Sequence, residues 1–157
     1  MGISKFIKYL RKFAGKVLFL CGLMDGDKKR EGLSSFNANS ILVKTDNLMK
    51  SERLYRSSEL TITQLARKIG TNRTYLSKCF RVNNTNYVDY VNEYRVVYAK
   101  SLFEDEHVGR KSITEISELS GFPNPRSFSK CFSKKYGITP SQFKRELLAR
   151  DTKNRFC

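Results

Sequence analysis

Short hydrogen-bond donors interleaved with arginine and lysine are the residues of this chain whose types and spacing point to chemistry. One such run covers residues 73–81 and a second covers residues 126–135. Hydroxyl groups beside cationic side chains suit the base edges and phosphates of nucleic acid. The first run contains Arg73, Thr74, Ser77, Lys78 and Arg81, and the second contains Arg126, Ser127, Ser129, Lys130, Lys134 and Lys135.

Residues suited to catalysis or metal binding are sparse by comparison. The sequence shows no nucleophile–base pair, glycine-rich phosphate loop or carboxylate dyad, so we predict no enzyme activity, no catalytic residue and no cofactor. The single histidine, His107, lies in a polar segment that we expect to form a loop. No two cysteines are close enough in sequence to form a metal-ligand pair, so we predict no metal site. The cysteines are Cys21, Cys79, Cys131 and Cys157.

The overall charge of the chain favours a polyanionic partner. Its 157 residues include 30 lysines and arginines and 15 acidic residues, a net charge of +15. Residues 1–50 carry a net charge of +6 and residues 51–157 a net charge of +9, so the excess is not confined to a tail. Such an excess favours nucleic acid first and an anionic membrane surface second.

The two polar runs belong to two copies of one sequence pattern, about 50 residues apart. The first copy covers residues 65–80 and the second covers residues 116–132. Aligning Gly70 with Gly121, and allowing one extra residue in the second turn, places Leu-Ser-Lys-Cys-Phe on Phe-Ser-Lys-Cys-Phe. One supersecondary unit is therefore predicted to occur twice.

Both copies carry the local signals of two helices joined by a tight turn. Thr61 with Gln64, and later Ser112 with Glu115, predict a capping box at the start of the first helix. The aligned glycine suits a left-handed residue that ends this helix, and an asparagine then caps the second helix. Small residues in the first helix, alanine or serine, allow a close approach, so each copy predicts a helix-turn-helix.

A long apolar stripe lies between the two copies. Its spacing over residues 87–103 predicts one amphipathic helix of about 17 residues, about 26 Å long. Major grooves on one side of DNA lie about 34 Å apart, so this connector suits two reading helices in neighbouring grooves. We expect the stripe to be core rather than a stacking platform for bases. It consists of Tyr87, Tyr90, Val91, Tyr94, Val97, Tyr98, Leu102 and Phe103.

The N-terminal part of the chain leaves three interpretations open. Residues 3–24 combine apolar side chains at helical spacing with lysine and arginine elsewhere. They fit a basic amphipathic helix on a partner or a membrane surface, a remnant of a longer upstream region, or a secretory signal. Residues 25–40 are rich in glycine, serine and asparagine and predict a polar linker. We therefore divide the chain into residues 1–40 and a domain of residues 41–157.

Three motifs of residues 60–150 are specific: the Gly121-Phe122 step, the run from Phe128 to Phe132, and Tyr-Gly-Ile-Thr-Pro-Ser-Gln-Phe at residues 136–143. With these motifs, residues 60–150 resemble the DNA-binding domain of AraC/XylS-type bacterial transcription regulators. The resemblance implies an all-α, homeodomain-like fold of seven helices. Two helix-turn-helix units and a long connector helix would form its core, residues 60–150 of the 41–157 domain.

The resemblance also implies roles for the polar residues, because the second helix of each unit would read a major groove. The expected base contacts are Thr74, Ser77, Lys78, Arg126, Ser129 and Lys130. The expected phosphate contacts are Arg73, Arg81, Lys134 and Lys135. Pro125 and Ser127 depart from the family pattern at the start of the second reading helix, so the preferred bases cannot be read from the sequence.

These observations lead to one functional hypothesis and two alternatives. The hypothesis is a sequence-specific, double-stranded DNA-binding transcription regulator in the bacterial cytoplasm, with RNA polymerase as a further partner. One alternative is a membrane-associated or partner-docking protein that uses residues 3–24. The other is an architectural DNA-binding protein without preferred sites.

Overall fold

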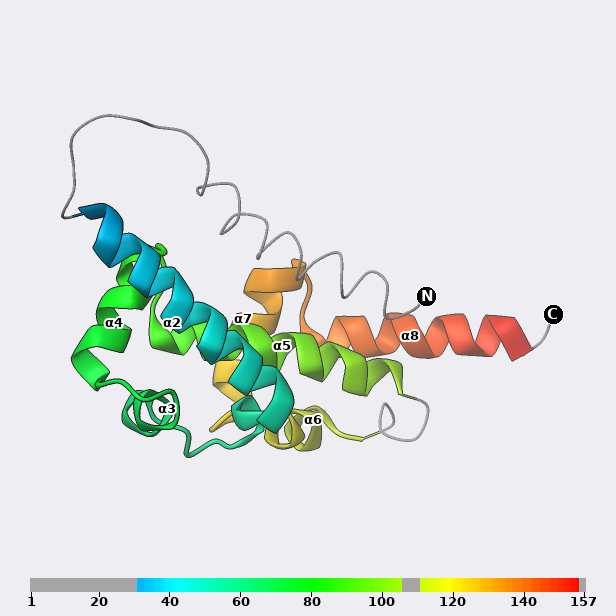
Figure 1. Ribbon diagram of the computed structural model, residues 1–157. Coiled ribbons are helices and arrows are strands. Elements are labelled where there is room, and N and C mark those ends of the chain that lie inside the picture. The colour runs from blue at the N-terminus through cyan, green and yellow to red at the C-terminus, as the bar shows by residue number, and fades with distance from the viewer. Residues whose placement is uncertain (1–30, 106–110, 156–157) are drawn as a thin grey trace.

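The computed structural model describes residues 31–105 and 111–155 (Figure 1). This part of the chain contains seven α-helices, one 3₁₀ turn and no strand, which confirms the predicted all-α fold. The predicted helix at residues 3–24 and His107 lie outside the described residues. The elements are α2 (Glu31–Glu52), η1 (Leu54–Arg56), α3 (Ile62–Lys68), α4 (Arg73–Val82), α5 (Tyr87–Glu104), α6 (Ile113–Leu119), α7 (Pro125–Tyr136) and α8 (Pro140–Arg155).

Helices α3 and α4 form the first predicted helix-turn-helix. Thr61 and Gln64 make the predicted capping box, in which the Thr61 N–H donates to the Gln64 side-chain oxygen at 2.8 Å. Gly70 follows α3 with a φ of +75°, a backbone conformation that favours glycine. Asn72 then caps α4 by accepting a hydrogen bond from the Tyr75 N–H at 2.8 Å. The local sequence signals therefore set both helix limits.

Helices α6 and α7 repeat this arrangement in the second unit. Ser112 and Glu115 make the capping box of α6, and Gly121 takes a φ of +85° in the turn. Asn124 caps α7, accepting from the Ser127 N–H at 2.8 Å. The seventh helix, α8, begins at a further capping pair as predicted, but it extends to Arg155 rather than ending near Ala149.

The connector helix α5 contributes to two separate hydrophobic cores. Its first half packs with α2, α3 and α4, and its second half packs with α6, α7 and α8. Of the predicted stripe, Tyr90, Val91 and Phe103 are buried in the cores, and the others are half-buried. Between Val91 and Phe103 the buried positions shift to Arg95, Val96 and Ala99, which the predicted stripe omitted. The shift follows because the two cores lie on different sides of the helix.

Helix α2 begins earlier than the sequence indicated. Residues 31–40 were predicted as part of a polar linker, but they form the first part of α2. Ala38 and Met49 are buried, and α2 packs mainly against α4. Tertiary packing therefore overrides the weak helix preference of the serines and asparagines in this stretch.

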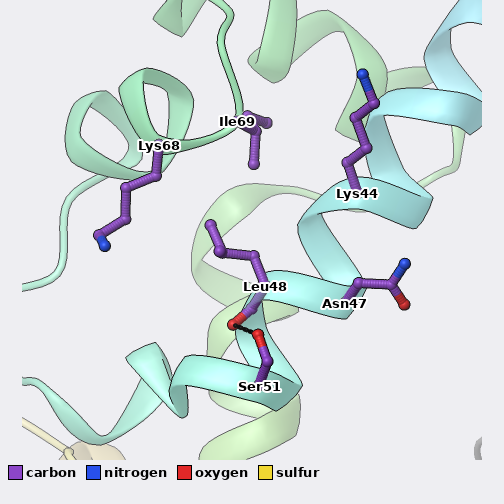
Figure 2. A pocket seen from close by; sticks show the side chains of 6 residues that line it. All are labelled: Lys44, Asn47, Leu48, Ser51, Lys68 and Ile69. Atoms are coloured by element: carbon purple, nitrogen blue, oxygen red, sulfur yellow. Dashed lines mark hydrogen bonds between the residues drawn. The ribbon is translucent and has the colours of Figure 1, made fainter.

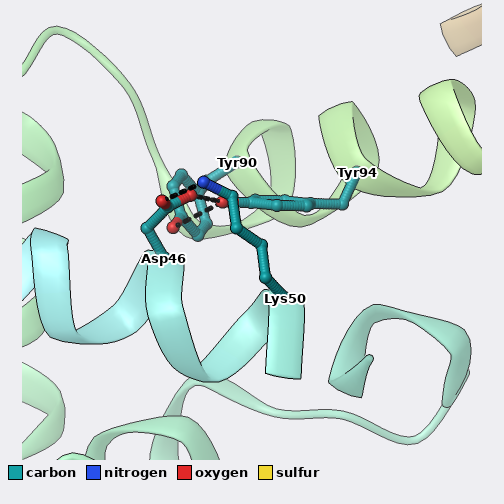
Figure 3. Close-up of polar contacts among 4 residues, drawn as sticks. All are labelled: Asp46, Lys50, Tyr90 and Tyr94. Carbon is teal, nitrogen blue, oxygen red and sulfur yellow. Dashed lines mark hydrogen bonds and ion pairs between the residues drawn. The ribbon is translucent and has the colours of Figure 1, made fainter. Parts of the chain in front are cut away.

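A hydrogen bond within a group of four polar side chains joins α2 to α5 (Figure 3). The Tyr94 hydroxyl donates to the carboxylate of Asp46, which also pairs with Lys50 one turn later. The Tyr90 hydroxyl lies 3.2 Å from the Tyr94 hydroxyl. Burial raises the pKa of both tyrosines well above the usual range, so both hydroxyls keep their protons and serve as donors.

Candidate nucleic-acid interface

The first reading helix, α4, separates its apolar and polar residues onto opposite faces. Its buried residues are Leu76, Cys79 and Phe80, of which Leu76 and Phe80 belong to the first core. The candidate base contacts Thr74 and Lys78 are exposed, and Ser77 lies half-buried between them. The candidate phosphate contacts on this helix are also exposed, namely Arg73 and Arg81.

The second reading helix, α7, shows the same division. Phe128 and Phe132 are fully buried in the second core. The polar candidates Arg126 and Lys130 are exposed and Ser129 is half-buried. Neither reading helix therefore lies inside the molecule, and each presents its candidate base contacts at the surface.

The two asparagine caps give the reading helices a common register. Counting from Asn72, the fifth and sixth residues are a serine and a lysine, Ser77 and Lys78. Counting from Asn124 gives the same pair, at residues 129–130. Because side chains at equal distances from the cap leave the helix in equal directions, the two units present one Ser–Lys pair in the same way.

The candidate phosphate contacts differ in their ionic partners. Within the described residues, no ion pair engages Arg73, Arg81 or Lys134. Lys135, in contrast, pairs with Glu93 of α5, and its side chain is only 10% exposed. Its amine also lies 5.8 Å from the centre of the Tyr136 ring. Lys135 thus meets the connector helix in this structure, whereas the other three face solvent.

The described residues give no arrangement suited to metal or thiol chemistry. No group of three histidine, cysteine or acidic side chains among them could hold a metal ion. Burial raises the pKa of the Cys79 and Cys131 thiols, which keeps both protonated and weakly nucleophilic. None of the described helices is both long and apolar enough to cross a bilayer.

A groove on the surface lies away from the reading helices. It is a shallow groove of about 350 Å³ between α2 and α3 (Figure 2). Lys68, at its edge, is already held by Glu52 at 2.6 Å. The groove is lined by Lys44, Asn47, Leu48, Ser51, Lys68 and Ile69.

The sequence analysis gave Arg95 no role at the interface, and the structure shows it buried. Arg95 sits on the apolar side of α5 and is 7% exposed. The sequence offered a signal, because a charged residue among buried positions needs polar partners. Those partners are backbone carbonyls of the η1 segment, which no side-chain pattern identifies.

Comparison with known proteins places the chain in a family. A family described as a helix-turn-helix domain matches residues 65–146. The Msm operon regulatory protein of Streptococcus mutans is 34% identical over 91 residues, which are 57% of this chain and 32% of that protein. The chain therefore spans about a third of this relative.

Two solved structures share the fold. An AraC-type transcriptional regulator from Chromobacterium violaceum matches 70% of this chain and 94% of its own, with 24% identity and a TM-score of 0.57. The DNA-binding domain of AdpA, solved in complex with a target DNA, matches the same shares with 20% identity and a TM-score of 0.57. With two helix-turn-helix units on one connector, and with this family match over more than half of its length, the chain belongs to the AraC-type helix-turn-helix family.

Proposed function

We propose that this protein is a transcription regulator that binds specific double-stranded DNA by inserting α4 and α7 into successive major grooves. The observation that carries the proposal is the repeated exposed face, with the same Ser–Lys pair at the same distance from each asparagine cap. The operon-regulating relative and the DNA complex of the similar AdpA domain support it.

The dimensions of the connector suit this mode of binding. Helix α5 has 18 residues and is therefore about 27 Å long. Successive major grooves on one side of a duplex lie about 34 Å apart. The reading helices lie at the surface beside the two halves of α5, so a spacing close to one helical turn of DNA is within their reach.

The exposed residues divide into two roles in this proposal. Specificity comes from base contacts, and affinity comes largely from phosphate contacts that release counterions. The proposed base contacts are Thr74, Ser77, Lys78, Arg126, Ser129 and Lys130. The proposed phosphate contacts are Arg73, Arg81 and Lys134. Lys135, the fourth phosphate candidate from the sequence, pairs with Glu93 and is not among them.

The experiment that tests the proposal is a selection from random duplexes with the full chain, at two salt concentrations. We expect two enriched sequence elements whose centres lie about 10 base pairs apart, and affinity that falls steeply with salt. A selection that returns salt-sensitive binding without any enriched sequence would contradict the proposal, and it would favour an architectural DNA-binding protein.

The cellular setting is part of the same proposal. A regulator of this kind acts in the bacterial cytoplasm without catalytic activity of its own, and RNA polymerase is its expected protein partner. Co-purification of polymerase on a promoter that contains the selected sequence tests the partner. Flotation with anionic liposomes, with and without residues 3–24, tests the competing membrane role, and flotation that depends on those residues would favour it.

A further inference from the structure

We propose that Arg95 is a positioning residue that fixes the angle between the two helix-turn-helix units by clamping residues 54–57 against the connector. The inference rests on the proposed function, because a fixed angle matters for recognition only if both reading helices bind one duplex. It concerns the geometry of the whole interface and adds no base contact.

The contacts of Arg95 join three parts of the chain. Its Nε donates to the Tyr55 carbonyl at 2.8 Å, and its Nη2 donates to the Ser57 carbonyl at 2.9 Å. Its guanidinium carbon lies 5.8 Å from the centre of the Phe122 ring, in the turn of the second unit. A buried arginine with carbonyl partners and no carboxylate partner among the described residues is held in one orientation by this fixed geometry.

The backbone around Gly121 shows how closely the same segment approaches the second unit. A Cβ at Gly121 would lie 2.4 Å from the Tyr55 carbonyl oxygen and 2.6 Å from that of Arg56. The corresponding glycine of the first unit, Gly70, has no atom within 4 Å of such a Cβ. The 54–57 segment, which leads into the first unit, therefore lies directly on the turn of the second.

Helix α5 packs in both cores, and the 54–57 segment forms a second link between the two units. The main packing of α3 and α4 is with α2 and with each other, whereas α6 and α7 pack on α5 and on each other. The Tyr55 ring stacks on Tyr94 of α5 at 5.6 Å and meets Tyr98 edge-on at 5.7 Å. The 54–57 segment therefore links the first unit to the second beside α5, and Arg95 is the side chain that holds its carbonyls.

The test replaces Arg95 with methionine and measures binding to three duplexes. The first is the selected duplex, the second carries one extra base pair between its two enriched sequences, and the third contains only one of these sequences. For the natural chain we expect the insertion to weaken binding on the order of tenfold, as for the loss of one good base contact. For Arg95→Met we expect the inserted base pair to weaken binding only about twofold, with unchanged affinity for the duplex that contains one enriched sequence. Arg53→Met, which removes an exposed arginine directly before the segment, should keep the tenfold loss of the natural chain.

A second measurement does not depend on DNA. Backbone residual dipolar couplings of the full chain report the orientation of α3 and α4 relative to α6 and α7. We expect Arg95→Met to change this relative orientation while the couplings within each unit stay constant. Arg95→Lys, which keeps the charge but cannot bridge both carbonyls, provides a milder variant should methionine prevent folding. Unchanged couplings and an unchanged insertion penalty in a folded variant would overturn the inference, whereas a selection without enriched sequences would overturn only the proposed function.

Discussion

Two buried serines of the second unit differ in their hydrogen bonding. Ser117 is fully buried and its hydroxyl has no hydrogen-bond partner among the described residues, although Ala66 fills the matching position of the first unit. Ser120 is equally buried, but its hydroxyl donates to the Ile116 carbonyl at 2.8 Å. The small volume at residue 117 was predictable from helix packing, whereas the unsatisfied hydroxyl was not.

This difference predicts opposite effects of alanine at the two positions. Ser117→Ala removes a hydroxyl that is buried without compensation, so we expect it to raise the free energy of unfolding by about 1 kcal/mol. Ser120→Ala removes a satisfied hydroxyl and should lower that free energy by about 1 kcal/mol. Urea unfolding of the two variants measures both effects. Equal destabilisation by both substitutions would show that the Ser117 hydroxyl has a partner in solution.

The capping box of α6 predicts a pH dependence of stability. The hydrogen bond from the Ser112 N–H, at 2.7 Å, holds the pKa of Glu115 below its usual value. The carboxylate therefore stabilises the fold fully above the ordinary glutamate pKa, about 4.3, and this contribution is lost as pH falls through the lower folded pKa. Glu115→Gln keeps the cap, as Gln64 does in the first unit, but it does not titrate.

Urea unfolding of the natural chain and Glu115→Gln over this pH range checks the expectation. The stability of the natural chain should fall more steeply with acidification, and the difference between the two proteins should shrink toward the acid end. Parallel pH profiles would mean that the carboxylate contributes nothing beyond what the amide supplies.

At the scale of elements, the two inter-helix turns look alike in sequence but differ in their surroundings. Both glycines have positive φ, so alanine is strained at either position. We expect Gly70→Ala to cost about 1 kcal/mol, because its Cβ would enter open space. Gly121→Ala should cost at least about 3 kcal/mol, because its Cβ would meet two backbone carbonyls that must move. Thermal unfolding compares them, and similar midpoints would contradict the close approach.

Adjacent lysines at the end of α7 offer a matched test of the phosphate contacts. Lys134 is exposed, whereas Lys135 pairs with Glu93. We expect Lys134→Gln to reduce the slope of log affinity against log salt by about 1, the effect of one lost phosphate contact. Lys135→Gln should leave the slope nearly unchanged. Binding titrations on the selected duplex at several salt concentrations measure the slope, and an equal reduction would show that Lys135 leaves Glu93 for DNA.

The helix limits of both units were predictable because capping is local. Thr61, Asn72, Ser112 and Asn124 each act on a backbone N–H three residues away, so a short stretch of sequence contains the whole signal. The start of α2 was not predictable in this way. Its stability depends on packing against α4, which lies far along the chain, and residues 31–40 carry no strong helix signal of their own.

At the scale of the whole molecule, the connector helix packs in two cores and holds residues 54–57 through Arg95. Its aromatic stripe was visible in the sequence because tyrosines recur at helical spacing. The hydrogen bonds from Arg95 to the carbonyls of Tyr55 and Ser57 were not visible in the sequence, because the acceptors are backbone atoms 40 and 38 residues away. The candidate reading faces were therefore predictable, but the geometry that relates them to each other was not.

Because α2 and residues 54–57 pack on the rest of the chain, we predict that residues 65–146, the part that matches the family, do not fold independently. A fragment of residues 58–157 lacks Met49, fully buried in the first core, and the carbonyls that satisfy Arg95. Losing a buried methionine side chain costs about 2–5 kcal/mol, and losing a hydrogen bond to a charged group costs about 1.5–3 kcal/mol for each of the two carbonyls. Because domains of this size are stable by about 5–15 kcal/mol, these losses are of the order of the total. Hydrogen exchange should show the amides of α3 and α4 unprotected in the fragment and protected in the full chain, and equal protection in both would mean that α2 and η1 are dispensable for the fold.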